Sequence, residues 1–350
     1  MRIDCVGTAG RHHPKTSILA GAVAVKDLSG WIPIRIDWQG PRPMVDWGYL
    51  GARRFSDPFF AQTINQCMRH PADLLFRHQT PLDTLGEIIA ATASVRPTGF
   101  IFHMSRCGST LVSQMLAASP QNIVLSEAGP IDDVLRAHFR DPKITEDQRV
   151  MWLTWLVAAL ACRRNPAEKN LFIKFDCWHV MLLPLIQRAF PGVPWVFLYR
   201  EPLEVMASAQ KQLGGQMIRG VLQAALFGWE AGTVEGMSLY DYTARVLARL
   251  CETALEHVSA GGGRLVNYLQ LPAAIWPELL RYWKVDFSDA DVARMLEAAQ
   301  MDAKNPVLPF ESDSRTKRES ISAELRGLSH QWLAGVYGQL EAQRQVTGFA

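Results

Sequence analysis

Short, almost wholly apolar runs alternate with longer amphipathic stretches from the second hundred of residues onward. We expect buried strands at residues 100–104, 122–125, 171–175, 194–199 and 263–268. Helices are predicted at residues 110–118, 149–164, 182–189, 203–213 and 221–259, and the rest is predicted to be helical with a loop at 305–314. Strands that lack polar alternation and alternate with helices indicate a parallel sheet covered on both faces. The pattern predicts a three-layer α/β fold.

The first part of the chain follows no such alternation. Residues 31–93 contain short apolar pieces, prolines and aromatic pairs, with helices predicted near 58–69 and 84–93. The cluster Arg96-Pro97-Thr98-Gly99 interrupts regular structure, and the pattern changes there. We therefore expect a small irregular N-terminal element of unknown role at residues 1–95 and an α/β domain at residues 96–350.

Composition narrows the class of protein. A hydrophobic share of 48% excludes a disordered chain, and 36 basic against 34 acidic residues give no electrostatic reason to expect a nucleic-acid partner. The six cysteines form no CxxC pair, which favours a reducing, cytoplasmic setting. The apolar run at residues 151–162 is shorter than the roughly 20 residues of a membrane span, so we expect a buried helix and no membrane partner.

The residues that follow the first strand suit an anion. Gly108 permits a tight turn, the next helix directs its free N–H groups at the same point, and Arg106 adds a forked cation. Ser109 and Thr110 add hydroxyl groups. A phosphate-binding loop is the interpretation we favour, and a helix cap with a surface arginine is the alternative. The loop is not a Walker A motif, because His103 stands where a glycine is needed and Ser109 where the lysine is needed.

Charged residues also stand at the other strand ends, which meet at one edge of a parallel sheet. Glu127 could take a proton there, or it could simply cap a helix. Lys174 could bind a transferring anionic group, or it could extend its amine to solvent. Arg200 and Ser208, about two helical turns apart, could share one more phosphate, although a lone arginine is usually part of a salt bridge.

These residues together resemble the sulfotransferases that use 3′-phosphoadenosine-5′-phosphosulfate (PAPS). Residues 104–111 are similar to the 5′-phosphosulfate loop of the branch that includes the protein-tyrosine sulfotransferases and many bacterial relatives, and residues 196–208 to the 3′-phosphate motif. The resemblance covers residues 98–320 and implies a P-loop-NTPase-like fold. It implies PAPS as co-substrate, the bisphosphate PAP as product, and no metal.

The resemblance also implies roles for individual residues. Glu127 would be the general base, with Lys174 and Arg106 at the transferred sulfonate. Residues that would hold the nucleotide are Arg106, Cys107, Gly108, Ser109, Thr110, Arg200, Ser208 and Tyr268, and more loosely Arg315 and Lys317. Cys107 stands where the family usually has serine, and Ser109 where it has threonine. A thiol at a helix N-terminus beside Arg106 is expected to have a low pKa and to react readily.

Several questions stay open at the level of sequence. His103 and His179 are alternative bases, and the aromatics Trp38, Trp47, Phe59 and Phe60 could line an acceptor pocket or simply cover the core. A P-loop kinase, or a nucleotide-binding protein without catalysis, is the alternative function. The acceptor hydroxyl could belong to a small molecule, a saccharide or a peptide. The sequence gives no indication of the oligomeric state.

Overall fold

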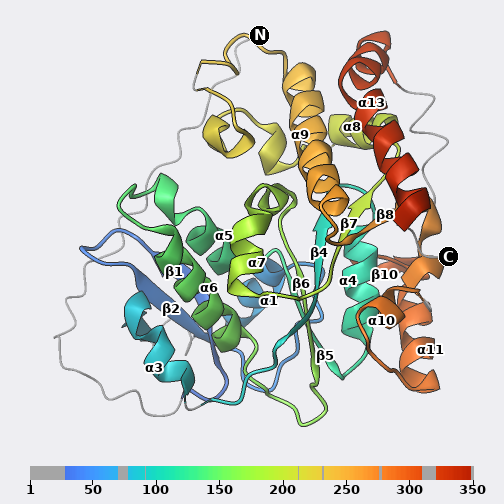
Figure 1. Ribbon diagram of the computed structural model, residues 1–350. Coiled ribbons are helices and arrows are strands. Elements are labelled where there is room, and N and C mark those ends of the chain that lie inside the picture. The colour runs from blue at the N-terminus through green and yellow to red at the C-terminus, as the bar shows by residue number, and fades with distance from the viewer. Residues whose placement is uncertain are drawn as a thin grey trace.

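A five-stranded parallel sheet runs through the middle of the molecule (Figure 1). The computed structural model describes residues 28–69, 78–90, 92–211, 213–230, 232–275, 278–309 and 321–347. The strands, in spatial order, are β5 (Asn122–Ser126), β6 (Asn170–Lys174), β4 (Pro97–His103), β7 (Trp195–Tyr199) and β8 (Arg264–Asn267). Every residue of β7 is buried, as expected for a central strand with both faces covered.

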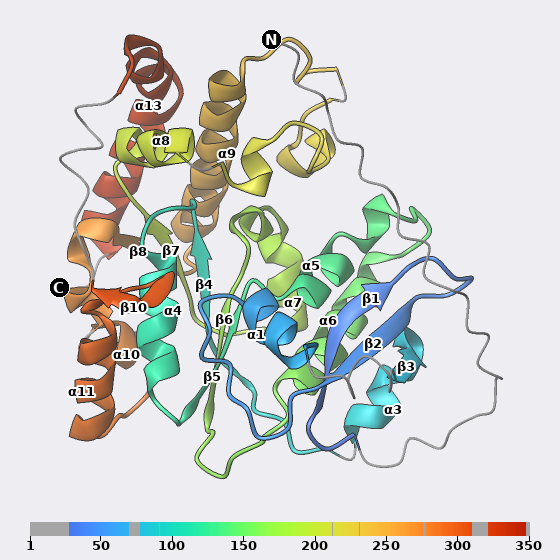
Figure 2. The ribbon, with the colours of Figure 1, turned by 180° about the vertical axis from the view of Figure 1, so that it is seen from behind.

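Helices cover both faces of the sheet. The helices are α4 (Ser109–Ala118), α5 (Gly129–Leu135), α6 (Glu146–Leu160), α7 (Leu183–Ala189), α8 (Pro202–Lys211), α9 (Leu239–Ser259), α10 (Glu278–Tyr282), α11 (Asp289–Ala298) and α13 (Ala323–Thr347). Two opposite views place α4, α11 and α13 on one side and α5, α6 and α7 on the other (Figures 1 and 2). This arrangement confirms the predicted three-layer α/β fold.

The N-terminal element is more regular than the sequence suggested. Its helices α1 (Phe60–Cys67) and α3 (Leu85–Ala90) confirm the two predicted helices. The strands β1 (Trp31–Asp37), β2 (Met44–Tyr49) and β3 (His78–Pro81) form an antiparallel sheet that the sequence analysis missed. The prediction of an irregular element was wrong because Pro33 obscured the alternating isoleucines of β1, and β3 pairs with β2 across almost thirty intervening residues.

Hydrogen bonds join this element to the α/β layers. The Arg54 guanidinium donates to the carbonyl oxygens of Ala117 (2.7 Å) and Ser119 (2.5 Å) at the end of α4. On the other face, the Trp152 indole of α6 donates to Asp83 Oδ1 at 2.8 Å. The buried apolar residues of both parts form one continuous cluster.

Two predicted elements in the second half of the chain were wrong. Residues 221–230 and 232–237 are turns and irregular backbone with one short 3₁₀ segment (Ala224–Phe227) rather than the start of a long helix, because Gly228 and Gly236 adopt left-handed conformations and Ser238 caps α9. The predicted loop at 305–314 begins with a strand, β10 (Asn305–Pro309), which pairs with β9 (Met301–Asp302). The apolar run at 151–162 does lie mostly in α6, and within the described residues no helix is long and apolar enough to cross a membrane.

Candidate functional site

The turn from β4 into α4 has the backbone of an anion-binding loop. Ser105, Arg106 and Gly108 all have positive φ angles, of 79°, 52° and 86°. Successive residues in such conformations turn their N–H groups toward one side, where α4 also begins. The N–H group of Ser105 is tied back to His103 Nδ1 at 3.1 Å.

Gly108 is required at its position for a second reason. A Cβ atom there would lie 2.8 Å from the Tyr268 ring and 2.9 Å from a methyl group of Leu271. The segment after β8, a 3₁₀ turn at Tyr268–Gln270, thus packs directly against the loop. The two sequence segments expected to bind one nucleotide are in contact.

The Cys107 side chain points away from the loop. Its Sγ is buried and donates to Leu198 O of β7 at 3.1 Å. Burial raises the thiol pKa to about 12, which outweighs the helix N-terminus and the nearby cations. The expectation of a reactive, low-pKa cysteine was wrong, because it took account of neighbouring charge but not of the direction of the side chain.

Glu127 and Lys174 form an ion pair at the ends of β5 and β6. The Lys174 ammonium lies 2.7 Å from Glu127 Oε1, and Lys174 is fully buried. Glu127 has a left-handed backbone (φ 54°), and its N–H donates to Lys174 O at 2.8 Å. The acid and the cation proposed for catalysis therefore meet at the edge of the sheet that carries the anion loop.

His103 lies behind this ion pair. Its Nδ1 accepts from Ser105, so Nε2 carries the proton and faces Phe175 O at 3.0 Å and Glu127 Oε1 at 3.6 Å. Burial lowers the pKa of His103. Burial alone would raise the pKa of Glu127, but attraction to Lys174 and the contact with His103 outweigh it and bring that pKa to about 2. A neutral His103 with its acceptor nitrogen already occupied supports Glu127 and is a poor base itself.

The second predicted anion site lies at the end of β7. The guanidinium of Arg200 bonds to Glu204 one helical turn later (Nε to Oε2, 2.7 Å) and stacks on the Tyr268 ring at 4.0 Å. Ser208 accepts a hydrogen bond from Arg106 Nε. Arg106 thus reaches the residue expected at the 3′-phosphate, and the two halves of the site share a hydrogen bond.

The C-terminal helix supports this side of the site. Glu341 of α13 accepts from the Tyr199 hydroxyl at 2.5 Å and from Asn267 Nδ2 at 2.7 Å. Tyr199 and Asn267 immediately precede Arg200 and Tyr268. One carboxylate therefore fixes the ends of both strands from which the stacked pair extends.

A third group of ionisable residues lies beside Glu127. Asp132, Asp176 and His179 bring potential metal-ligand atoms within 4.8 Å of one another. Their atoms already have partners, since His179 Nε2 lies 2.9 Å from Asp132 Oδ1 and the Trp178 indole donates to the same oxygen at 2.8 Å. His179 Nδ1 faces the N–H of Asp176 at 3.3 Å. We interpret the group as a hydrogen-bond network rather than a metal site, and His179 is engaged there instead of at the loop.

The sequence analysis missed one cation of the site, Lys304, and two cations that it did predict lie outside the described residues. Lys304 lies in the turn between β9 and β10, where Asp302 Oδ1 accepts from its N–H at 2.9 Å. Partial burial of its ammonium, then repulsion by Arg106 and Lys174, lower its pKa, so it belongs to the same charge cluster. The turn composition Asp-Ala-Lys-Asn was the available signal. Arg315 and Lys317 lie outside the described residues.

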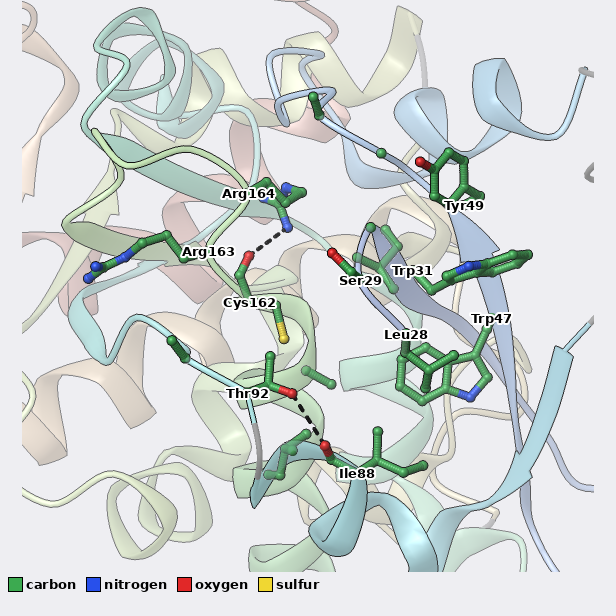
Figure 3. A pocket seen from close by; sticks show the side chains of 17 residues that line it. Leu28, Ser29, Trp31, Trp47, Tyr49, Ile88, Thr92, Cys162, Arg163 and Arg164 are labelled. Atoms are coloured by element: carbon green, nitrogen blue, oxygen red, sulfur yellow. Dashed lines mark hydrogen bonds between the residues drawn. The ribbon is translucent and has the colours of Figure 1, made fainter. Parts of the chain in front are cut away.

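A cavity of about 590 Å³ lies elsewhere, between the antiparallel sheet and the ends of α3 and α6 (Figure 3). Trp31 and Trp47 face Ile88 and Thr92 across it. It adjoins Cys162, whose backbone pairs with that of Ser94 in an isolated antiparallel β-bridge just before β4. The cavity is therefore at the amino ends of the parallel strands, away from the anion loop.

Comparison with known proteins relates part of the chain to a protein family. Residues 97–241 match the model of the sulfotransferase family. A search of the curated proteins gave no match. Solved structures that resemble this chain include the sulfotransferase domain of the curacin biosynthetic pathway (15% identity, TM-score 0.41), covering 74% of this chain and 99% of that one. A sulfotransferase from Mycobacterium tuberculosis resembles it at 16% identity and a TM-score of 0.40, covering 71% and 79%.

A retinol dehydratase solved with retinol and PAP matches at 11% identity and a TM-score of 0.32, covering 79% of this chain and 89% of that one. The matched family segment contains Arg106, Glu127, Lys174, Arg200 and Ser208. Residues 97–241 of this chain are thus similar to the sulfotransferase family.

Proposed function

We propose that the protein moves the sulfonyl group of PAPS to an acceptor hydroxyl, with Glu127 as the general base. The similarity of residues 97–241 to the sulfotransferase family supports sulfonyl transfer in general. The observation that carries the finer proposal is the fully buried Lys174 ammonium, 2.7 Å from Glu127, beside a left-handed anion loop. A buried cation paired with a carboxylate that is only a quarter exposed is costly to maintain, and such pairs are common where chemistry needs them.

The charge arrangement suits a ligand with several anionic groups. Arg106, Lys174, Arg200 and Lys304 supply four cations, against the carboxylates of Glu127 and Glu204. The loop N–H groups and Arg106 suit the 5′ end, and Arg200 with Ser208 suits the 3′-phosphate. The Tyr268 ring, already stacked on Arg200, would place Arg200 toward that phosphate.

The ion pair gives Glu127 a way to become a base when substrate arrives. With a pKa of about 2, Glu127 is a weak base while Lys174 neutralises it. A sulfonate that takes up the Lys174 ammonium would remove this neutralising contact, and burial would then raise the pKa of Glu127. Glu127 would therefore become able to accept a proton in the complex with the bound sulfonate donor, where the transfer takes place.

The transfer itself is a substitution at sulfur. The acceptor oxygen forms a bond to sulfur, the bond from sulfur to the 5′-phosphate oxygen breaks, and its electron pair stays on that oxygen. Glu127 receives the hydroxyl proton, while Lys174 and Arg106 stabilise the charge that grows on the leaving phosphate oxygen. The products are a sulfate ester and PAP.

Nucleotide preference tests the proposal. PAP should raise the melting temperature more than AMP or ATP with magnesium, because a charged hydrogen bond to the 3′-phosphate is worth about 1.5–3 kcal/mol. Arg200→Lys should reduce this preference, since lysine lacks the fork and the stacking surface. Arg188→Lys is the control, because Arg188 is exposed and pairs with Glu146 and Asp147 at the surface.

Two outcomes would contradict the proposal. Stronger stabilisation by ATP with magnesium would favour the kinase alternative. Transfer is assayed by mass detection of a sulfonate added to small-molecule, saccharide or peptide hydroxyls. Tight PAP binding without any such transfer would favour a binding protein. An N-terminal extension at residues 1–95 and a transferase domain at residues 96–350 remain part of this proposal.

A further inference from the structure

The Lys174 ammonium is poorly matched by hydrogen-bond acceptors. Its side chain has no exposed surface, so water does not solvate it. Within the described ranges, Nζ has no hydrogen-bond partner of good geometry, although Glu127 Oε1 lies 2.7 Å away. An ammonium carries three donors, and burial makes unmatched donors unfavourable. Something besides Glu127 must stabilise the charge at this place.

The face of an aromatic ring meets the ammonium. Lys174 Nζ lies 4.6 Å from the centroid of the Phe59 ring, within the roughly 6 Å over which the negative face of a ring attracts a cation. The attraction is stronger where water is excluded. Phe59 comes from the N-terminal element, outside the segment that matches the family.

The surroundings of Phe59 keep its ring in place. It precedes α1, and its N–H donates to Gln62 Oε1 at 3.2 Å. Phe60 stacks on Phe55 with centroids 5.6 Å apart, and the Arg164 guanidinium lies over Phe55 at 4.8 Å. Of the other aromatics proposed for an acceptor pocket, Trp38 packs on Trp152, and Trp47 lines the cavity at the amino ends of the parallel strands.

We propose that Phe59 is a positioning residue for Lys174, and that the N-terminal element completes the sulfonate-binding end of the site. This inference rests on the proposed function. When the sulfonate takes the place of Glu127 as the anionic partner of Lys174, the Phe59 ring remains and holds the ammonium in position. A ring makes no hydrogen bond to the ammonium, so the N–H groups stay available to the sulfonate oxygens.

Donor binding tests the inference without knowledge of the acceptor. Isothermal titration would compare PAPS with PAP, which lacks the sulfonate, on protein carrying mono-, di- and trifluorinated phenylalanine at position 59. Fluorine weakens the negative face of the ring with little change in shape. The affinity for PAPS should fall stepwise, to about one tenth at trifluorination, while the affinity for PAP stays unchanged. Phe59→Trp should keep the affinity for PAPS, and Phe59→Leu should lose it as the trifluorinated protein does.

A matched control and a double variant separate positioning from packing. The same fluorination at Phe60, which stacks on Phe55, should leave both affinities unchanged. In a Lys174→Met background, fluorination at position 59 should have no further effect on PAPS binding. A flat response to fluorination at Phe59, or an equal response with Lys174 removed, would overturn the inference while the proposed function stands. Wild-type protein that binds neither PAPS nor PAP would overturn both.

Discussion

Glu127 has two roles at the scale of a single residue, because it is both the proposed base and the counter-ion of a buried lysine. Glu127→Gln should lower turnover by about 10²–10⁴, the usual effect of losing a general base. It should also lower the free energy of unfolding without ligand by about 3–5 kcal/mol, because Lys174 is left buried without a neutralising partner. Chemical denaturation and a PAPS turnover assay measure the two effects separately.

The two roles can be separated with a second substitution. In Glu127→Gln with Lys174→Met, no uncompensated charge is buried, so much of the lost stability should return while turnover stays low. Added PAPS should also stabilise Glu127→Gln more than wild type, since its sulfonate supplies the missing negative charge beside Lys174. Full activity of Glu127→Gln would rule out Glu127 as the base.

Asp176 makes stability depend on pH. Burial raises the pKa of Asp176 from 3.8 to about 7. The attraction of His179 opposes this shift, and the negative charges of Glu127 and Asp132 add to it. Between these two values the unfolded chain has lost the proton and the native state keeps it, so native stability falls as pH rises through this window. Asp176→Asn, which has no proton to lose, should gain about 1–3 kcal/mol relative to wild type from pH 4 to pH 8.

Thermal melts across that range check the prediction. Asp147→Asn is the control, because 85% of the Asp147 side chain is exposed and its removal should shift all melts equally. A constant difference between Asp176→Asn and wild type at every pH would show that Asp176 titrates normally.

At the scale of elements, the turn between β4 and α4 requires a glycine for two reasons, its backbone conformation and the lack of space for a Cβ. Gly108 combines a φ of 86° with the Tyr268 ring 2.8 Å from where a Cβ would stand. Gly108→Ala should push the loop and the 3₁₀ turn apart, and reduce the PAP-induced rise in melting temperature. Gly192→Ala is a matched control, since Gly192 has a φ of 76° but nothing within 4 Å of a Cβ.

Both alanine variants should lose about 1 kcal/mol or more of stability to backbone strain. Only Gly108→Ala should reduce the PAP-induced rise in melting temperature, because a Cβ at position 108 meets the Tyr268 ring and one at position 192 meets nothing. An unchanged PAP response in Gly108→Ala would separate this turn from nucleotide binding.

The elements that sequence predicted correctly are those whose burial is decided locally. Apolar runs such as residues 195–199 are buried on both faces, and their strand ends pointed to Glu127, Lys174 and Arg200. The antiparallel sheet escaped prediction because β2 and β3 pair across a long segment whose pattern is weak. Residues 221–237 were misread because two glycine turns were given less weight than the surrounding apolar residues.

The pairing of side chains in the site could be predicted only in part. The i,i+4 spacing of Arg200 and Glu204 was an available signal for their ion pair, but nothing in the sequence indicated that Phe59 and Lys304 would join Lys174. These contacts depend on how separate elements pack. The direction of Cys107 into the sheet is a further example, since only the fold decides which face of a turn is covered.

At the scale of the whole molecule, the N-terminal element behaves as part of one core. Arg54 donates to two carbonyl oxygens at the end of α4, and its burial lowers the pKa of the guanidinium. Arg54→Met should leave the Ala117 carbonyl without this donor and the Ser119 carbonyl with only the Asn122 N–H at 3.2 Å, and cost about 1.5–3 kcal/mol. Because the apolar cluster is continuous, the loss should lower a single unfolding transition of the whole chain.

Denaturant melts followed by fluorescence and by circular dichroism test this prediction. Arg53→Met is the control, because Arg53 bonds Gln66 at the exposed surface. Two separated transitions in Arg54→Met, with the first confined to residues 28–93, would show that the N-terminal element is an independent unit.

The contact of Glu341 with Tyr199 and Asn267 has a consequence for how the protein is made. The strands β7 and β8 are synthesised well before α13, yet their ends are fixed by a carboxylate of α13. A nascent chain can therefore form its sheet on the ribosome while the Arg200–Tyr268 side of the site is still unfinished. The capacity to bind a nucleotide should arise only once α13 has been made and has docked, and fragments that stop short of α13 should fold a core that does not yet bind.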